Sequence, residues 1–329
     1  MSVAPPLDGP LLAASAAVAT ARSDARSGRV RAAIAMLEPL LRASVTWSPD
    51  ERIAAIEIVI DAHLALGDLR AAIAWDTTMH LDSADLPLEA VARGHFARGE
   101  LASAMDQPDS ALDEFCAAGA AGADLAVPHL AWRSGAALAL VRLGRRREAL
   151  AHARDHLALV HSHQTDPAAV ALALRTLATA ESDGFRVTRL IEARGLLVDG
   201  HAPRLRAQLD TDLAGLLVLE GRLVEAMEIL REVERFASSH HLSPLLGRAR
   251  RLIERLGETP RRRETEALGV LTAAERRVAL LALDGLTNRD IAASLVISVK
   301  AVEGHLSRIY RKLGITSRAA LLDAVGVRL

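Results

Sequence analysis

Cationic and polar side chains recur along one face of the segment Ser298–Leu313. The apolar residues of this segment follow one another at steps of three and four, which predicts an amphipathic helix that buries Val299, Val302, Leu306, Ile309 and Leu313. The opposite face carries Lys300, Glu303, Gly304, Ser307, Arg308 and Arg311. Cations with this spacing can contact phosphates on both rims of a DNA groove, and the missing side chain at Gly304 lets the backbone lie close to a base pair. The alternative is an ordinary amphipathic helix whose basic face is only solvated.

Capping residues predict two further helices upstream of this one. Thr272 and Glu275 have the spacing of a capping box, and Thr287 with Asp290 is a shorter version of the same device. The serine that precedes the third helix can cap it in turn. Only Leu295–Ile297 separate the second helix from the third, so these two helices must turn sharply on each other. A tight helix-turn-helix with an exposed second helix suits the DNA major groove.

The residues of this region also form a dense and specific motif. It consists of Leu271-Thr-x-x-Glu275, Gly285-Leu-Thr-Asn-Arg-Asp-Ile-Ala292, Ile297-Ser298, Val302, His305-Leu306 and Arg311-Lys-Leu-Gly-Ile-x-Ser-Arg318. On these residues, 271–325 resembles the LuxR-type (GerE-like) helix-turn-helix of bacterial transcription regulators, over about one sixth of the chain. The resemblance implies a four-helix domain that reads DNA with its third helix and dimerises largely through its last helix, near Ala319–Val325.

The resemblance and the cationic face together predict which residues contact DNA. They are Thr287, Asn288, Arg289, Ser298, Lys300, Ala301, Glu303, Gly304, Ser307, Arg308, Arg311, Lys312 and Arg318. The chain departs from the family at Glu303, Gly304 and Ser307, where relatives often carry Lys or another base-reading residue. Glu303 can accept a hydrogen bond from cytosine but repels phosphate, so the operator of relatives cannot be transferred to this chain.

The distribution of charge supports a two-part organisation. The whole chain holds 40 basic and 41 acidic residues, a formal net charge of −1, which does not by itself favour DNA binding. Residues 258–329 hold 12 basic and 8 acidic residues, a net charge of +4, so the remainder carries −5. Both lysines of the chain, Lys300 and Lys312, lie in the predicted third helix. The basic character is therefore concentrated where the motif requires it.

Turn signals and prolines recur about every 39 residues through the first three quarters of the chain. The turns lie at positions 28, 67, 106, 144, 184 and 221, and the prolines at positions 10, 49, 87, 128, 167, 203 and 244. Each of the first six prolines suits the first turn of a helix that ends at the following turn. Ser48, Asp166 and Ser243 precede three of the prolines and are expected N-caps. The unit is thus a helix, a turn and a second helix, repeated about six times and closed by a helix at Leu245–Leu256.

Units of this kind cannot bury both faces alone, so we expect them to stack into an α-solenoid. The array resembles a tetratricopeptide-like superhelix, although its period is longer than the usual value of about 34 residues. It also lacks that family's full Trp-Leu-Gly-Tyr pattern. The alternative is an Ala-rich helical bundle with fortuitous spacing. Trp47, Trp75 and Trp132 are expected core anchors between repeats, with the lining of a ligand groove as the alternative.

The expected fold is therefore all-α, a tetratricopeptide-like α-solenoid followed by a four-helix LuxR-type helix-turn-helix domain. Residues 1–257 form the repeat domain, with a sensing or docking role, and residues 270–329 form the DNA-binding domain. Residues 258–269, with proline, glycine and alternating charge, are an expected linker. Arg261–Arg263 in that linker can touch DNA phosphate or an acidic surface of the solenoid, or can simply be solvated.

Residues with catalytic potential are sparse. The chain has no Gly-x-x-x-x-Gly-Lys phosphate loop and no alternation of strands with helices, so neither a nucleotide-binding ATPase nor a receiver domain is expected. His152 and His156 share a helix face, and His161 and His163 follow. However, Ala153 stands where a zinc hydrolase requires glutamate, so a solvated or capping role is expected for these histidines. We expect no enzyme activity, no catalytic residue, no cofactor and no metal.

The remaining composition favours a cytoplasmic, nucleoid-associated protein with no membrane partner. The single Cys116 permits no intramolecular disulfide. The segment Leu11–Ala21 is apolar and Ala-rich, but no positive charge precedes it and charged residues follow closely, so we expect a helix and not a signal peptide. No stretch approaches the length of a bilayer-spanning helix. The abundance of alanine and arginine, with almost no lysine, suggests a GC-rich bacterial genome.

The sequence as a whole predicts a transcription regulator that binds double-stranded DNA as a homodimer. The repeat region would bind a protein or a small-molecule ligand that controls DNA binding, and RNA polymerase is a further candidate partner. One alternative is a protein-interaction scaffold whose C-terminal domain serves only dimerisation. Another is a sigma-factor-like initiation protein, although an acidic solenoid supplies neither promoter melting nor polymerase binding.

Overall fold

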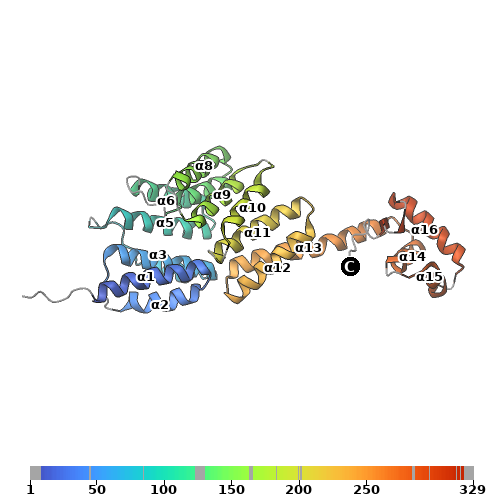
Figure 1. Ribbon diagram of the computed structural model, residues 1–329, viewed down its shortest axis with the longest axis horizontal. Helices are drawn as coiled ribbons and strands as arrows, with labels where there is room; N and C mark the ends of the chain where they lie inside the picture. The colour runs from blue at the N-terminus through green and yellow to red at the C-terminus, as the bar shows by residue number, and fades with distance from the viewer. Residues whose placement is uncertain are drawn as a thin grey trace, which may run out of the picture. The chain divides into compact units, whose positions relative to one another are not determined.

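The computed structural model contains sixteen helices and no strand in the part of the chain that it describes (Figure 1). That part comprises residues 9–43, 46–83, 85–122, 130–162, 166–182, 184–198, 200, 202–283, 286–295, 297–315, 317–318 and 320–321. The chain divides into two compact units, Met1–Arg250, here called the repeat unit, and Arg251–Leu329, here called the helix-turn-helix unit. The prediction of an all-α fold is confirmed. None of the described helices is both long and apolar enough to cross a lipid bilayer.

The repeat unit consists of six helical hairpins and the beginning of a closing helix. The hairpins are α1 (Gly9–Ser27) with α2 (Val30–Arg42), α3 (Pro49–Leu66) with α4 (Leu69–Asp76), α5 (Leu88–Ala104) with α6 (Pro108–Ala121), α7 (Trp132–Arg142) with α8 (Arg146–Ser162), α9 (Pro167–Ala180) with α10 (Arg186–Leu196), and α11 (Pro203–Leu219) with α12 (Leu223–Ser239). All six turns fall at the positions that the sequence period predicts. Position 183 in the fifth turn lies outside the described residues.

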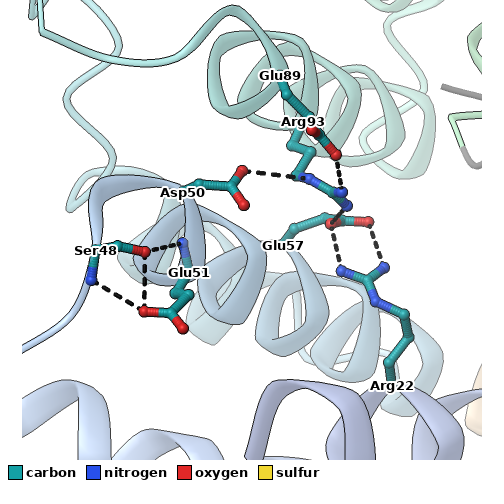
Figure 2. Close-up of polar contacts among 7 residues, drawn as sticks. All are labelled: Arg22, Ser48, Asp50, Glu51, Glu57, Glu89 and Arg93. Atoms are coloured by element: carbon teal, nitrogen blue, oxygen red, sulfur yellow. Dashed lines mark hydrogen bonds and ion pairs between the residues drawn. The ribbon is translucent and has the colours of Figure 1, made fainter. Parts of the chain in front are cut away.

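The second hairpin, α3 with α4, shows how local sequence sets the ends of these helices (Figure 2). The Glu51 amide donates to Ser48 Oγ at 3.2 Å, and the Ser48 amide donates to Glu51 Oε2 at 3.1 Å. Pro49 lies between the two members of this capping box, at the first helical position, where it needs no amide partner. Gly67 ends α3 with φ of 82°, in the left-handed region where a Cβ would introduce strain.

The other two predicted N-caps have different outcomes. Asp166 caps α9 as predicted, because its Oδ1 accepts from the Ala168 amide at 3.0 Å. Ser243 is instead the first residue of α13 (Ser243–Gly269), and Leu242 O accepts the amide of Leu246 at 2.9 Å. The prediction of Ser243 as an N-cap is therefore wrong, since the helix starts one residue earlier.

The closing helix α13 is also longer than predicted. Its backbone stays helical to Gly269, through the segment 258–269 that the sequence predicts as a linker. Glu, Arg, Ala and Leu fill most of this segment and are strong helix formers, which accounts for the continuation. The prediction that the helix ends at Leu256 is therefore wrong. The side chains of Arg261–Arg263 lie outside the described residues, so their predicted contacts stay a prediction.

The first helices of successive hairpins form a continuous row, because α1 contacts α3, α3 contacts α5, and the pattern repeats to α11. The row also closes on itself, since α1 contacts α11. Val30 and Ala62 share an apolar cluster with Ala237 and Leu242, which joins the first two hairpins to the sixth. The sequence period predicted the stacking but not this closure.

Close packing between hairpins depends on glycine at specific places. Phe115 is fully buried between α5 and α7, where Gly99 and Gly135 face its ring. A Cβ on Gly99 would lie 2.6 Å from Phe115 Cε1, and one on Gly135 would lie 2.5 Å from the same atom. Any larger side chain at these two positions must displace the ring.

The tryptophans contact neighbouring helices of the repeat unit. Trp75 is 8% exposed, and its indole donates to Glu38 Oε1 at 2.9 Å. Trp132 packs against Gly119 of the preceding hairpin. The indole of Trp47 donates to Leu40 O at 3.4 Å. Trp75 and Trp132 thus lie between helices, as predicted. None of the three tryptophans lines the cavity of the repeat unit that is described below.

The histidines of α8 only partly have the solvated or capping role that the sequence predicts. His156 is 3% exposed and its Nδ1 lies 2.6 Å from Ser134 Oγ, so the expectation of a solvated or capping role is wrong for this residue. His152 instead stacks edge-on against Trp132. His163 lies outside the described residues. No group of three His, Cys, Asp or Glu residues suited to a metal ion occurs in the described part of the chain.

Candidate nucleic-acid interface

Three short helices build the core of the helix-turn-helix unit: α14 (Ala273–Leu283), α15 (Asn288–Leu295) and α16 (Val299–Leu313). Val302, Leu306 and Ile309 of α16 are at most 6% exposed and pack with residues of α14 and α15. The predicted apolar stripe is confirmed for these residues. Val299 is 40% exposed, so its predicted burial is wrong, because the first turn of α16 extends past the core.

Each of the three helices begins at the predicted cap. The Glu275 amide donates to Thr272 Oγ1 at 3.3 Å, and the Asp290 amide donates to Thr287 Oγ1 at 3.3 Å. Ser298 Oγ accepts from the Ala301 amide at 3.1 Å and so starts α16. The hydroxyls of Thr287 and Ser298, two of the predicted DNA contacts, therefore also fix the start of α15 and α16.

An ion pair between the exposed Lys312 and the buried Glu275 joins the beginning of α14 to the end of α16. Lys312 Nζ lies 2.6 Å from Glu275 Oε2, and Glu275 is only 4% exposed. The lysine, the Thr272 amide and the Thr272 hydroxyl together lower the pKa of Glu275 to about 2, so the carboxylate stays ionised. The ammonium of Lys312 is thus engaged by Glu275 in the free protein. Sequence alone gave no signal for the pair, because 37 residues separate its members.

Arg318 likewise has contacts within the unit. Its guanidinium donates to Ala282 O at 2.9 Å, to Leu286 O, and to Asn288 Oδ1 at 3.4 Å. These acceptors lie at the end of α14 and the start of α15, so Arg318 connects the two helices. The predicted DNA-contact residues Asn288 and Arg318 are therefore found together, with their side chains committed to each other in the free protein.

The open face of α16 contains the rest of the predicted site. Its exposed side chains are Lys300, Glu303, Ser307, Arg308 and Arg311, and Arg289 is exposed on α15. Within the described residues, Lys300, Glu303, Ser307 and Arg311 have no hydrogen-bond or ion-pair partner. Arg308 has only peripheral contacts, with Nη2 at 3.2 Å from His305 Nδ1 and Nε at 4.0 Å from Glu275 Oε1.

The middle of this face is unobstructed. No atom lies within 4 Å of the place where a Cβ on Gly304 would be, as the sequence pattern requires for a close approach of the backbone to a base pair. Ala301 is half-buried on the same helix. The structure thus presents a cationic face with a flat centre, which has the shape and charge to enter a DNA major groove.

The last part of the unit is only partly described. Leu321 is 1% exposed and belongs to the same core, and the Ala320 amide donates to Ser317 Oγ at 3.1 Å. Ala319 and residues 322–325, the rest of the predicted dimerisation helix, lie outside the described residues, as do Gly285, Val296 and Thr316. The homodimer therefore stays a prediction.

The arrangement of α14, α15 and α16 and the exposed cationic face of α16 together define a helix-turn-helix DNA-binding domain. Residues 269–325 match the family described as "Bacterial regulatory proteins, luxR family". These residues form a LuxR-family helix-turn-helix domain, which confirms the resemblance seen in the sequence.

Known proteins with a similar sequence carry regulator names. Two are named as candidate HTH-type transcriptional regulators, one in Mycobacterium bovis and one in Mycobacterium tuberculosis, and each is 42% identical over 72 residues. That stretch is 22% of this chain and 8% of each relative, so the chain spans under a tenth of the length of these curated relatives. Among solved structures, BtubC (BKLC) from P. vanneervenii has a TM-score of 0.44 at 16% identity, over 69% of this chain and 92% of that one.

Proposed function

We propose that this protein is a sequence-specific transcription regulator that binds double-stranded DNA as a homodimer, with α16 of each protomer in the major groove. The observation that carries the proposal is the exposed cationic face of α16, centred on the open backbone at Gly304, where Lys300 and Arg311 have no partner among the described residues. DNA neutralises such cations and releases counterions, so a face left without internal partners is the one that gains most from binding.

Within this proposal, the exposed residues of the site divide into two roles. Lys300, Arg308 and Arg311 contact phosphate, as does Arg289 at the start of α15. Glu303 and Ser307 contact base edges, because they flank the open backbone at the centre of the face. A glutamate can accept from cytosine N4, and a serine can pair with several bases.

The remaining predicted DNA-contact residues support binding mainly because they position α15 and α16. Lys312 holds α16 to α14, and Arg318 with Asn288 fixes the junction of α14 with α15. Thr287, Ser298 and Ala301 set the first turns of α15 and α16, where free amides attract phosphate. These residues support DNA binding by fixing the helix that enters the groove.

The repeat unit completes the proposal as the regulatory part, which binds a ligand or a partner protein and changes DNA affinity. A change of this kind requires that the ligand bind one state of the protein more tightly than the other. The LuxR-family domain and the regulator names of similar proteins support regulation on the chromosome without enzyme activity.

Selection of binding sites from random duplex DNA with the full-length protein tests the proposal directly. We expect a recurring sequence of two half-sites related by a two-fold axis, centred about one helical turn apart. Recovery of no preferred sequence, together with salt-dependent binding to any duplex, would contradict sequence-specific regulation. No DNA binding at low salt would favour the scaffold alternative instead.

A further inference from the structure

The first helices of the six hairpins line a half-open cavity of about 630 Å³ in the repeat unit. Residues of α1, α3, α5, α7, α9 and α11 line it, together with His156 of α8. The closure of the row, through the contact between α1 and α11, turns the concave side of the repeats into this cavity. Its volume is in the range that small-molecule sites occupy.

The arginines of the cavity are all paired with carboxylates. Glu57 accepts from both terminal nitrogens of Arg22, at 3.3 and 3.2 Å, and lies between Arg22 and Arg93 (Figure 2). The remaining pairs are Arg26 with Asp166 at 3.8 Å, Arg175 with Asp212 at 2.6 Å, and Arg204 with Asp61 at 2.6 Å. An anionic ligand would have to compete with these carboxylates for every guanidinium.

Glu100 of α5 is the exception among the charged side chains that line the cavity. It has no hydrogen-bond or ion-pair partner among the described residues, and it is exposed to the solvent of the cavity. Although solvent reaches the side chain, the surrounding helices crowd its carboxyl, and this desolvation, followed by the nearby charge of Asp61, raises the pKa of Glu100 to about 7 against the opposing charges of Arg204 and Arg175. Four arginines and four carboxylates line the cavity, and Glu100 is the one carboxylate among them that is not paired with an arginine in the described residues.

The rest of the lining is apolar or neutral. Phe96, Leu138, Leu172 and Leu205 contribute apolar surface. His156 adds no charge at neutral pH, because burial and then Arg133 lower its pKa to about 4. A ligand that fits this lining has one positive group and an apolar body.

We propose that the cavity binds a small organic cation, an amine whose ammonium group pairs with Glu100 and whose apolar body lies against Phe96 and the leucines. As an effector this ligand rests on the proposed function, since it would change DNA affinity, but its binding does not depend on DNA. An ammonium ion is stabilised by an unpaired carboxylate in a partly desolvated site far more than on an open surface.

The test is calorimetric titration of the full-length protein with three probes of similar size and different charge: phenethylamine, 2-phenylethanol and 3-phenylpropanoate. We expect the amine to bind at least about tenfold more tightly than the alcohol, and the anion to bind most weakly. Hexylamine and cadaverine extend the amine series. Equal binding of amine and alcohol, tighter binding of the anion, or no binding of any amine below about 10 mM would overturn the proposal.

Two variants assign the binding to Glu100. Glu100→Gln keeps the shape and removes the charge, and should weaken phenethylamine binding by about tenfold or more. Glu228→Gln removes an exposed carboxylate of α12 that does not line the cavity, and should leave binding unchanged. Unchanged amine affinity in Glu100→Gln would overturn the assignment, provided that both variants melt at the temperature of the parent protein or above.

The number of protons released when the amine binds is a further readout, which an apolar cavity without a titrating carboxyl would not show. Because the Glu100 carboxyl has a pKa of about 7, influenced by Asp61, Glu57, Arg204 and Arg175, amine binding near pH 6 should release close to one proton, and near pH 8 almost none. Titrations in buffers of different ionisation enthalpy measure this release. Absence of proton release at both pH values would contradict a role for Glu100.

A DNA-affinity measurement with and without phenethylamine then separates the two proposals. Amine binding without an effect on DNA affinity would retain the site and reject its role as an effector site. Failure of all DNA binding would reject the proposed function while leaving the calorimetric result intact.

Discussion

The repeat unit and the helix-turn-helix unit use their arginines in opposite ways. In the repeat unit the cations reach carboxylates on other helices, as Arg204 of α11 does when it binds both oxygens of Asp61 on α3 at 2.6 and 2.9 Å. On α16 the cations of the open face, such as Lys300 and Arg311, have no such partner among the described residues. Charges that a fold leaves unpaired show where a ligand of opposite charge can bind. By this criterion α16 suits a polyanion, and Glu100 suits a cation.

The largest expected effect comes from removing the three exposed cations on the open face of α16. The full-length triple variant Lys300→Ala, Arg308→Ala, Arg311→Ala should lose DNA affinity on the order of 100-fold at low salt. The slope of log affinity against log salt should fall by about 3, one unit for each lost phosphate contact. Titration of labelled duplex at several salt concentrations measures both quantities.

The matched control removes the same charge from the repeat unit. Arg145, Arg222 and Arg250 are surface arginines that pair with neighbouring glutamates of that unit. Their combined replacement by Ala should change DNA affinity no more than a few fold. An equal loss in both triple variants would show that net charge, and not the face of α16, determines binding.

The second expected effect concerns packing in the repeat unit. Gly135→Ala places a Cβ against the buried ring of Phe115 and should lower the free energy of unfolding by about 1–3 kcal/mol. Gly215→Ala, in α11 with open space around the new Cβ, should instead raise it by about 0.5–1 kcal/mol. Denaturant unfolding followed by circular dichroism measures the pair. An equal change in the free energy of unfolding for the two variants would mean that helix propensity outweighs the contact with Phe115.

A third effect separates base contacts from phosphate contacts on α16. Glu303→Ala and Ser307→Ala should change the selected DNA sequence, with a loss of about 1–3 kcal/mol in discrimination for each base contact removed. Arg311→Ala should weaken binding to all sequences alike. Site selection repeated with each variant makes the comparison, and an unchanged site for both Glu303→Ala and Ser307→Ala would remove these residues from the set of base contacts.

A fourth effect contrasts two adjacent cations at the end of α16. Lys312 pairs with the buried Glu275, whereas Arg311 is unpaired within the described residues. The pKa of Glu275 is lowered from 4.5 to about 2 in the folded protein, so this carboxylate stabilises the fold above about pH 4.5 and loses that contribution as the pH falls toward 2. Lys312→Ala should lower the melting temperature of the helix-turn-helix unit at neutral pH and flatten its dependence on acid pH. Arg311→Ala should leave both unchanged, as melting curves between about pH 3 and pH 7 would show.

Local signals accounted for most of the fold and for the exposed polar face of α16. Prolines, turn residues and capping boxes act within a few residues of the chain, so they predicted the six hairpins and the start of α16. The contacts that complete the structure join distant positions. Arg204 and Asp61 are 143 residues apart, and no periodicity in the sequence pairs them. For the same reason the sequence did not distinguish Lys312, which pairs with Glu275, from Lys300, which has no partner among the described residues.

The smallest expected effect is the pH dependence of stability that Glu100 causes in the absence of ligand. Its pKa is raised from 4.5 to about 7 on folding, so between these values the folded protein binds more protons than the unfolded chain. Its contribution must therefore destabilise the fold progressively as the pH rises from 4.5 to 7, and then stay constant. Glu100→Gln removes this dependence, while the other carboxylates titrate alike in both proteins and cancel in the difference. The variant should melt at the same temperature as the parent near pH 4.5 and at a higher temperature above pH 7. Parallel melting curves over this range would mean that Glu100 is solvated as on an open surface, and the enclosure that distinguishes the cavity from the face of α16 would lose its support.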